Sequence, residues 1–376
     1  MDLDIDEASA AFRDEAREWL ASHVRELPSM DTAEGFAAHR EWEAELAGAR
    51  WSVVSWPREY HGRDASMLQW LLFEEEYYAA GAPGRVSQNG IFMLGPTLFA
   101  HGTQEQRDRI LPAMATGEQV WAQAWSEPEA GSDIAALRST AVRTEGGWLL
   151  SGQKTWSSRA TFADRAFGLF RTDPSAQRHH GLTYFMADLR ADGVTVRPIP
   201  QLDGEPGFAE IFFDDVFVPD ADVIGEAGQG WRVAMTTANN ERGLSLRSPG
   251  RFLAAADRLV GLWRSQGAPV STRDRVADAW IGARAYQLYT FGTVSRLEDG
   301  GELGPESSVN KLFWSHLDVE LHETALDVLG ATAETDDAWV NGYLFSLAGP
   351  IYGGTDQIQR NTIAERLLKL PREARR

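Results

Sequence analysis

The chain contains no cysteine and no long apolar run, and each absence excludes a class of protein. Without cysteine there is no disulfide framework, and no thiolate can act as a nucleophile or metal ligand. No stretch of about 18 apolar residues occurs, so the sequence predicts no membrane span. Residues 1–6 are acidic and lack the basic and apolar regions of a signal peptide. We therefore expect a cytoplasmic protein.

Positive charge and clustered histidine are scarce as well. The 376 residues include 36 Lys and Arg against 55 Asp and Glu, a formal net charge of −19. Nucleic acids and anionic membranes attract clustered Lys and Arg, so we expect neither as a partner. The 8 His residues are scattered, and His179 and His180 have no further ligand at a suitable spacing. The sequence therefore predicts no metal site.

Three segments differ in the spacing of their apolar residues. Residues 1–120 show helical spacing, and Thr103 with Gln106 forms a capping box at one helix start. Residues 121–225 contain short apolar runs separated by turn residues, which indicates a β barrel or sandwich. Helical spacing returns over residues 226–376 and predicts a four-helix bundle. The expected fold is α+β, mostly α, with these three segments as its domains.

The same spacing gives the bounds of the individual elements. Helices are expected over residues 7–25, 34–48, 67–80, 88–100, 103–115, 229–246, 250–267, 273–298, 306–329, 336–347 and 356–370. Strands are expected over residues 136–143, 148–152, 165–171, 182–189, 194–198 and 209–218. Residues 225–230 are rich in glycine but lack the dinucleotide fingerprint spacing, so we interpret them as a linker.

A polar loop over residues 125–133 (WSEPEAGSD) is the most informative segment. It exposes hydroxyls and backbone N–H groups, which suit a flat ligand rich in hydrogen-bond acceptors. Composition alone would make it a loop between domains. Two further motifs follow, at residues 152–158 (GQKTWSS) and 351–360 (IYGGTDQIQR). In this order and at these separations, the three resemble the motifs of the acyl-CoA dehydrogenase family, which binds FAD.

The resemblance covers essentially the whole chain, including the order of helical, β and helical segments, and it implies a set of cofactor contacts. Donors at Trp125 and Ser126 match positions that bond the pyrimidine side of the flavin. Trp156 resembles the residue that packs on one flavin face, and Ser158 resembles the hydroxyl that reaches flavin N5. The remaining implied FAD contacts are Ser132, which also lies at the mouth of the acyl-CoA site, and Tyr352, Thr355 and Gln357.

The position of the catalytic base departs from the commonest family pattern. Many members carry Glu directly after the Tyr of the last motif, where this chain has Gly353. Some members place the base on an earlier helix, at a residue that precedes an Arg, and Glu241 with Arg242 matches that pattern. We interpret Glu241 as the base that removes the α-proton while hydride passes to flavin N5. The alternative is a solvated helical Glu that pairs with Arg242 or with nothing.

The acyl thioester site follows from the same resemblance. The backbone N–H of Gly353 is expected to bind the thioester carbonyl, and Ser132 and Arg242 are expected to bind substrate. The predicted reaction is the introduction of an α,β double bond into an acyl thioester on CoA or an acyl-carrier protein. Electron-transfer flavoprotein is the expected electron acceptor.

Two segments that hold the neighbouring subunit's FAD in homotetrameric relatives are altered. Residues 262–267 (LWRSQG) and 329–332 (LGAT) replace an Arg-x-x-Phe-Gly and a Gly-Gly-x-Gly segment. The pattern resembles members of actinobacterial sterol and polyketide catabolism, in which two different subunits form an α2β2 tetramer. We therefore expect a tetramer, with a second dehydrogenase-like subunit favoured over four identical chains. Two alternatives remain: a flavin monooxygenase or oxidase on the same fold, and a degenerate subunit that stabilises an active partner.

Overall fold

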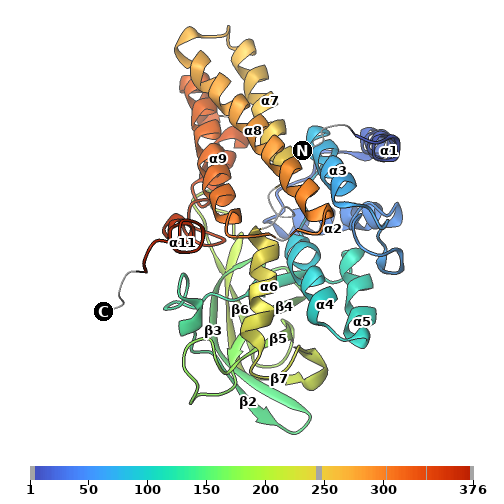
Figure 1. The fold of residues 1–376 in the computed structure, drawn as a ribbon, viewed down its shortest axis with the longest axis vertical. Helices are drawn as coiled ribbons and strands as arrows, with labels where there is room; N and C mark the ends of the chain where they lie inside the picture. Colours follow the sequence, from blue (N-terminus) through green and yellow to red (C-terminus); the bar gives the residue numbers. More distant parts are fainter. Residues whose placement is uncertain (1–4, 243–247, 302, 336, 373–376) are drawn as a thin grey trace. The chain divides into compact units, whose positions relative to one another are not determined.

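A computed structural model describes residues 5–242, 248–301, 303–335 and 337–372, except for the side chains of residues 240–242 and 337. The described chain is mostly helical and folds as two compact units (Figure 1). Unit 1 comprises residues 1–25, 65–82 and 242–376, and unit 2 comprises residues 26–64 and 83–241. None of the helices in these ranges combines the length and apolarity needed to cross a membrane.

Unit 2 is built on a strongly bent sheet in which the strand order is β6-β7-β3-β2-β4-β5-β8, with β1 paired in parallel to β4. Its strands are β1 Trp121–Ala124, β2 Thr140–Thr144, β3 Gly147–Ser158, β4 Arg165–Arg171, β5 Leu182–Asp188, β6 Val194–Ile199, β7 Phe208–Pro219 and β8 Val223–Ile224. The long pair β3–β7 is antiparallel, and its register shifts twice, between Leu150 and Gly152 and between Lys154 and Ser157.

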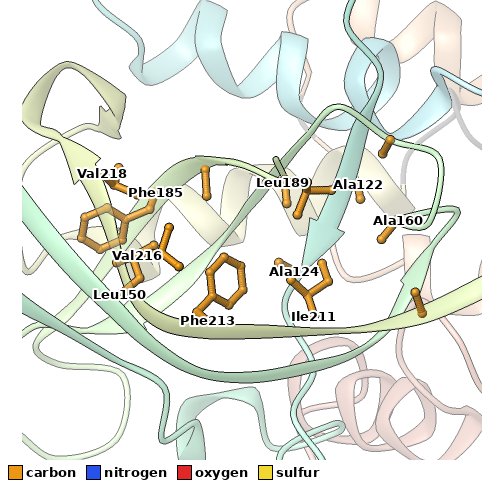
Figure 2. Close-up of a cluster of buried hydrophobic side chains, with 14 of the residues drawn as sticks. Ala122, Ala124, Leu150, Ala160, Phe185, Leu189, Ile211, Phe213, Val216 and Val218 are labelled. Carbon is orange, nitrogen blue, oxygen red and sulfur yellow. The ribbon is translucent and has the colours of Figure 1, made fainter. Parts of the chain in front are cut away.

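Apolar side chains from several strands fill the interior of the sheet (Figure 2). Phe185 of β5 and Phe213 of β7 are among the large members, and small residues such as Ala122 and Ala124 of β1 lie in the same cluster. Gly152 allows β3 to approach Ser139 closely, because a Cβ there would lie only 2.8 Å from the Cα of Ser139. This packing fixes β1 and β3, the two strands that border the first two sequence motifs.

Helices complete unit 2. They are α2 Ala33–Gly48, a π-helical turn Gly90–Leu94 that continues as α4 Gly95–His101, α5 Gln104–Ala115 and α6 Gly230–Arg242. The predicted capping box of α5 is confirmed, because Thr103 Oγ1 accepts from the Gln106 N–H while Gln106 Oε1 accepts from the Thr103 N–H. The glycine-rich segment before α6 is anchored to β5, since the N–H of Gly228 donates to Thr183 Oγ1 at 2.8 Å.

Unit 1 is a helical bundle. Its helices are α1 Glu7–His23, α3 Met67–Ala79, α7 Pro249–Ser265, α8 Arg273–Glu298, α9 Ser307–Leu329, α10 Asp337–Ser346 and α11 Asp356–Thr362. Phe252 of α7, Tyr286 of α8 and Trp314 of α9 are buried together at its centre. The two altered segments lie at helix ends, because α7 ends at Ser265 and α9 ends at Leu329.

The predicted helix over residues 273–298 has the observed bounds, while several other bounds were wrong. The strand predicted at 136–143 begins only at Thr140, because residues 134–136 form a 3₁₀ turn. The strand predicted at 148–152 continues to Ser158, since Gly152 interrupts the register without ending the strand. The helix predicted at 356–370 becomes a π-helical turn after Thr362. The division of the chain at residues 120 and 225 stays a prediction.

Candidate active site

The loop after β1 is held against β3 by backbone bonds. The N–H of Thr155 donates to the carbonyl of Ser126 at 2.8 Å, and Glu127 and Ala130 exchange two backbone bonds. Trp125 and Ser126 are half-buried, while Ser132 is exposed. The ring of Trp125 meets Tyr184 of β5 edge-on, with 6.3 Å between ring centres. The structure thus brings the segments around Ser126 and Thr155 together.

A buried ion pair lies directly beneath this loop. Lys154 Nζ is 2.8 Å from Glu127 Oε1 and donates to the carbonyl of Leu169 at 2.7 Å. The Glu127 carboxylate also accepts from the backbone N–H groups of Arg138, at 2.6 Å, and Ser139, at 3.0 Å. Burial lowers the pKa of the Lys154 amine to about 8, although the Glu127 charge opposes that shift. Burial would raise the pKa of Glu127, but the Lys154 charge and the bonds it accepts lower it instead.

Trp156 has a backbone conformation that is rare for a bulky residue. Its φ is +58°, and it lies in the second register shift of β3. The side chain is 60% exposed and touches Phe208 edge-on, with 6.0 Å between ring centres. Residues held in this region cost of order 1–3 kcal/mol and are typical of functional sites. The neighbouring Ser158 is half-buried and pairs with Phe208 across β7.

Two polar atoms near these residues are buried without a hydrogen-bond partner in the described part of the chain. They are Nε1 of Trp125 and Oγ of Ser157. A buried donor left unpaired costs about 1–3 kcal/mol, so such groups call for an explanation. The exposed ring of Trp156 lies in the same stretch of β3 as Ser157, and it offers an aromatic face against which a flat ring could pack.

Helix α6, which carries Glu241, is fixed to the rest of unit 2 by a chain of buried hydroxyls. Thr237 Oγ1 lies 2.8 Å from Thr97 Oγ1 of α4 and 3.0 Å from the phenol oxygen of Tyr184. Glu241 follows Thr237 by four residues, about one helical turn. The backbone of Glu241 and Arg242 forms the C-terminal end of α6, and their side chains lie outside the described part of the chain.

The third motif forms a tight turn in unit 1. Gly353 and Gly354 have φ values of +62° and +90°, which glycine adopts without steric cost. The side-chain amide of Gln359 donates to both of their carbonyls, at 3.0 and 3.1 Å. Thr355 caps α11, as predicted, because its Oγ1 accepts from the N–H of Ile358. Gln357 is exposed on the first turn of that helix.

Aromatic and charged side chains of unit 1 support this turn. Tyr352 stacks on Trp314 of α9 with 6.0 Å between ring centres. Asp356 is buried and lies 2.7 Å from His316 Nε2. Lys311 is buried nearby and donates to the carbonyl of Gly349 at 2.7 Å. The turn that carries Gly353 is therefore fixed from α9 on both its sides.

Sequence reasoning missed the residues that support the predicted site residues. Lys154, Glu127 and Gln359 all lie inside the recognised motifs, yet nothing in their spacing shows which way their side chains point. Tyr184 and Thr237 lie outside the motifs. No signal in the sequence could have found Lys154, because the strand was predicted to end at residue 152 and the residues around Lys154 are polar.

Comparison with known proteins agrees with this architecture. Models described as the N-terminal, middle and C-terminal domains of acyl-CoA dehydrogenase match residues 6–118, 122–216 and 228–368. The chain is 40% identical over 383 residues to acyl-CoA dehydrogenase IpdE1 of Mycobacterium tuberculosis, covering 97% of this chain and 98% of the relative.

Two solved complexes share the fold along the whole chain. The Tcur3481-Tcur3483 steroid ACAD has a TM-score of 0.88 and 26% identity, covering 99% of this chain and 100% of that one. The ChsE4-ChsE5 complex from Mycobacterium tuberculosis has a TM-score of 0.86 and 26% identity, with full coverage of both chains. Since sequence and fold agree over nearly all residues, the chain belongs to the acyl-CoA dehydrogenase family and is an oxidoreductase.

Proposed function

We propose that this acyl-CoA dehydrogenase binds FAD and introduces an α,β double bond into an acyl thioester, with Glu241 as the base. Family members bind FAD. The observation that carries the proposal is Trp156, a large aromatic side chain that stays 60% exposed at a left-handed backbone position. The strain is explained if the indole packs against a cofactor ring, and the unpaired donors at Trp125 and Ser157 support that reading.

Residues of all three motifs would hold the cofactor. Trp125, Ser126 and Ser158 would donate to the ring, and Trp156 would pack on its face. Thr355, Gln357, Tyr352 and Ser132 would contact the rest of FAD. When bound, FAD supplies the acceptor for the hydride that leaves the β-carbon. Donors fixed before the reaction stabilise the arriving negative charge without rearrangement, which is the main way such groups accelerate a step.

Glu241 would remove the α-proton from the face of the substrate opposite the flavin. A base must lie within hydrogen-bond reach of that proton, so its helix must be held in place. The bonds from Thr237 to Thr97 and Tyr184 hold α6 one turn before Glu241. Arg242, the next residue, would contact the substrate. The absence of a side chain at Gly353 supports this assignment, because the commonest position for the base is empty of carboxylate.

The backbone N–H of Gly353 would bind the thioester carbonyl and stabilise its enolate character as the α-proton leaves. Gln359 supports this role, because it bonds both glycine carbonyls and so fixes the orientation of the peptide groups in the turn. A glycine at this position also leaves room beside the α-carbon. We therefore infer that the acyl group is branched or ring-bearing, in line with the similarity to the Tcur3481-Tcur3483 steroid ACAD.

The assembly is proposed to be a tetramer with a second dehydrogenase-like subunit, which would complete the FAD site. The altered segments at residues 262–267 and 329–332 support it, and so do the paired names of the two similar complexes. CoA is the proposed carrier, with an acyl-carrier protein as the alternative. Electron-transfer flavoprotein is the proposed acceptor.

Anaerobic titration of the purified chain, alone and co-expressed with a neighbouring dehydrogenase subunit, tests this function. We expect flavin absorbance in the purified protein, loss of that absorbance on addition of a ring-bearing acyl-CoA, and an enoyl-CoA product by mass spectrometry. Protein that holds flavin but is reduced only by an external donor, and then consumes oxygen, would instead be an oxygenase. Protein that holds no flavin in any assembly would be a stabilising subunit.

A further inference from the structure

The ion pair between Lys154 and Glu127 links the loop over residues 125–133 to β3 and β4. Lys154 lies two residues before Trp156 on β3, and its side chain is fully buried. Its amine bonds Leu169 of β4 and Glu127, and it lies 3.5 Å from the carbonyl of Trp125. One side chain of β3 thus reaches the residues on either side of Ser126 and the neighbouring strand β4.

Glu127 closes the other side of the same loop. Its two carboxylate oxygens accept from the N–H groups of Arg138 and Ser139, the residues that lead into β2. Because its own backbone pairs with Ala130, the loop is tied at its start and at its end. With the bond from Thr155 N–H to Ser126 carbonyl, the loop has no freedom to slide along β3.

Stability alone gives a weak reason for an ion pair at this position. Desolvating two charges costs several kcal/mol per ion, and apolar residues of similar volume often stabilise a fold as well or better. A buried pair with five directed hydrogen bonds differs from an apolar pair, because the bonds fix the register and orientation of the segments that they join. The segments whose orientation it fixes are residues 125–126 and 155–158.

We propose, on the basis of the proposed FAD-dependent function, that Lys154 and Glu127 are positioning residues for the cofactor, which hold the Ser126 and Trp156–Ser158 segments at a fixed separation. Neither side chain need touch FAD. Their effect is to keep the Ser126 donor and the Trp156 ring in the arrangement that binds the flavin before it arrives. Preorganisation of this kind raises affinity because the loop is not ordered at the moment of binding.

The test compares Lys154→Met with a matched loss of an ion pair elsewhere in the same unit. Arg165→Met removes the ion pair between Arg165 and Asp222, which are 2.7 Å apart, 16% and 5% exposed and outside the three motifs, while Asp222 keeps its second partner, Arg109. The double variant Lys154→Met/Glu127→Gln removes both charges, so that it folds even if the single variant does not. All are made in the full chain, in whichever assembly of the wild type binds FAD.

Two measurements are made, and only one needs the cofactor. In the apoprotein, we expect the amides of Arg138, Ser139 and Thr155 to exchange with deuterium at least about tenfold faster in the Lys154 variants. Titration with FAD should give a Kd at least about tenfold higher than that of the wild type, which corresponds in free energy to the loss of one charge-assisted hydrogen bond. The visible spectrum of the bound flavin should also shift. Arg165→Met should keep the wild-type spectrum and an affinity within about twofold.

The outcomes distinguish a failure of this inference from a failure of the proposed function. If either Lys154 variant binds FAD with wild-type affinity and spectrum, the pair is only structural and the inference is wrong. The inference also fails if Arg165→Met weakens FAD binding as strongly, because the effect is then general to unit 2. If no wild-type assembly binds FAD, the proposed function fails, and the inference fails with it.

Discussion

The phenol oxygen of Tyr184 lies 3.0 Å from the hydroxyl of Thr237, while its ring meets Trp125 edge-on. One side chain therefore joins the loop of the first motif to the helix that carries Glu241. The ring also stacks on Phe167, so the position of Tyr184 does not depend on its hydroxyl. Removal of that hydroxyl should loosen α6 without moving Trp125.

Tyr184→Phe should lower the rate of flavin reduction by acyl-CoA by up to about tenfold. A 1 Å misplacement of a catalytic group costs about a hundredfold, and the loss of one hydroxyl should displace Glu241 by less than that. FAD affinity should stay within about twofold, because the ring still packs on Trp125. Stopped-flow reduction and FAD titration measure the two effects. Tyr60→Phe is the matched control, because it removes a buried phenol that bonds Asp108 at 2.9 Å in the same unit. Equal slowing in the control would contradict the proposed link.

Glu241→Gln should preserve FAD and substrate binding and slow flavin reduction by at least about a hundredfold, the lower end of what a general base contributes. The amide is nearly the same size as the carboxylate but does not accept the α-proton. Glu226→Gln, an exposed charge in the turn before the same helix, is the control and should reduce at the wild-type rate. Wild-type reduction in Glu241→Gln would assign the base to another residue or to the partner subunit.

Ser157→Ala and Ser158→Ala should differ although the two residues are adjacent. Ser157 Oγ is buried without a partner among the described residues, so its loss should leave the thermal unfolding of the apoprotein unchanged or improve it. Ser158→Ala should leave the fold intact and weaken flavin reduction, because Ser158 would supply the donor beside flavin N5. Calorimetry of the apoprotein and stopped-flow reduction of the holoprotein separate the two. A fall in stability for Ser157→Ala would show that its hydroxyl is bonded.

Many of the helices and their caps could be predicted from the sequence, because helix periodicity and capping are local properties. The bounds of α8 and the caps at Thr103 and Thr355 followed from residues within a few positions of one another. What failed depends on packing between distant segments. The extension of β3 through Trp156 requires β7 to follow its two register shifts, and no spacing within residues 147–158 indicates them. The pairing of Lys154 with Glu127, 27 residues apart, is hidden for the same reason.

The pH dependence of stability should report on Lys154. Its pKa is about 8 in the folded chain, below the ordinary value of 10.5, because burial disfavours the charged amine. Between these values the unfolded chain binds more protons than the folded chain, so this group makes stability rise with pH over that range, by at most about 1.4 kcal/mol per pH unit. Below about pH 8 both states are protonated and the contribution is flat.

Denaturant unfolding of the wild type and the double variant Lys154→Met/Glu127→Gln from pH 7 to 10 isolates this contribution, since the carboxylate whose pKa depends on Lys154 is removed together with the amine. The difference in free energy of unfolding between them should grow in favour of the wild type above about pH 8. A difference that stays constant over the whole range would mean that the amine keeps its proton and that the pair remains ionised.

Gly353→Glu tests the acyl pocket, and the backbone makes Gly353→Ala its necessary control. Gly353 has a φ of +62°, so either side chain must adopt a left-handed conformation, at about 1–2 kcal/mol. Both variants should therefore lose similar stability. In the proposed site, only the Glu variant would fill the space beside the α-carbon and would add a second carboxylate to that of the proposed base. Turnover of ring-bearing acyl-CoA should fall further in Gly353→Glu than in Gly353→Ala, relative to straight-chain substrates.

The pH profile of the same variant gives a second measure. Two neighbouring carboxylates do not both ionise easily, so the apparent pKa of the base should rise and the pH optimum of Gly353→Glu should move upward. Gly353→Ala should keep the wild-type optimum. The experiment is done in the assembly that binds FAD, and native mass spectrometry gives its composition. A fully active tetramer of identical chains with four FAD would refute the mixed assembly, and unchanged selectivity in Gly353→Glu would refute the pocket.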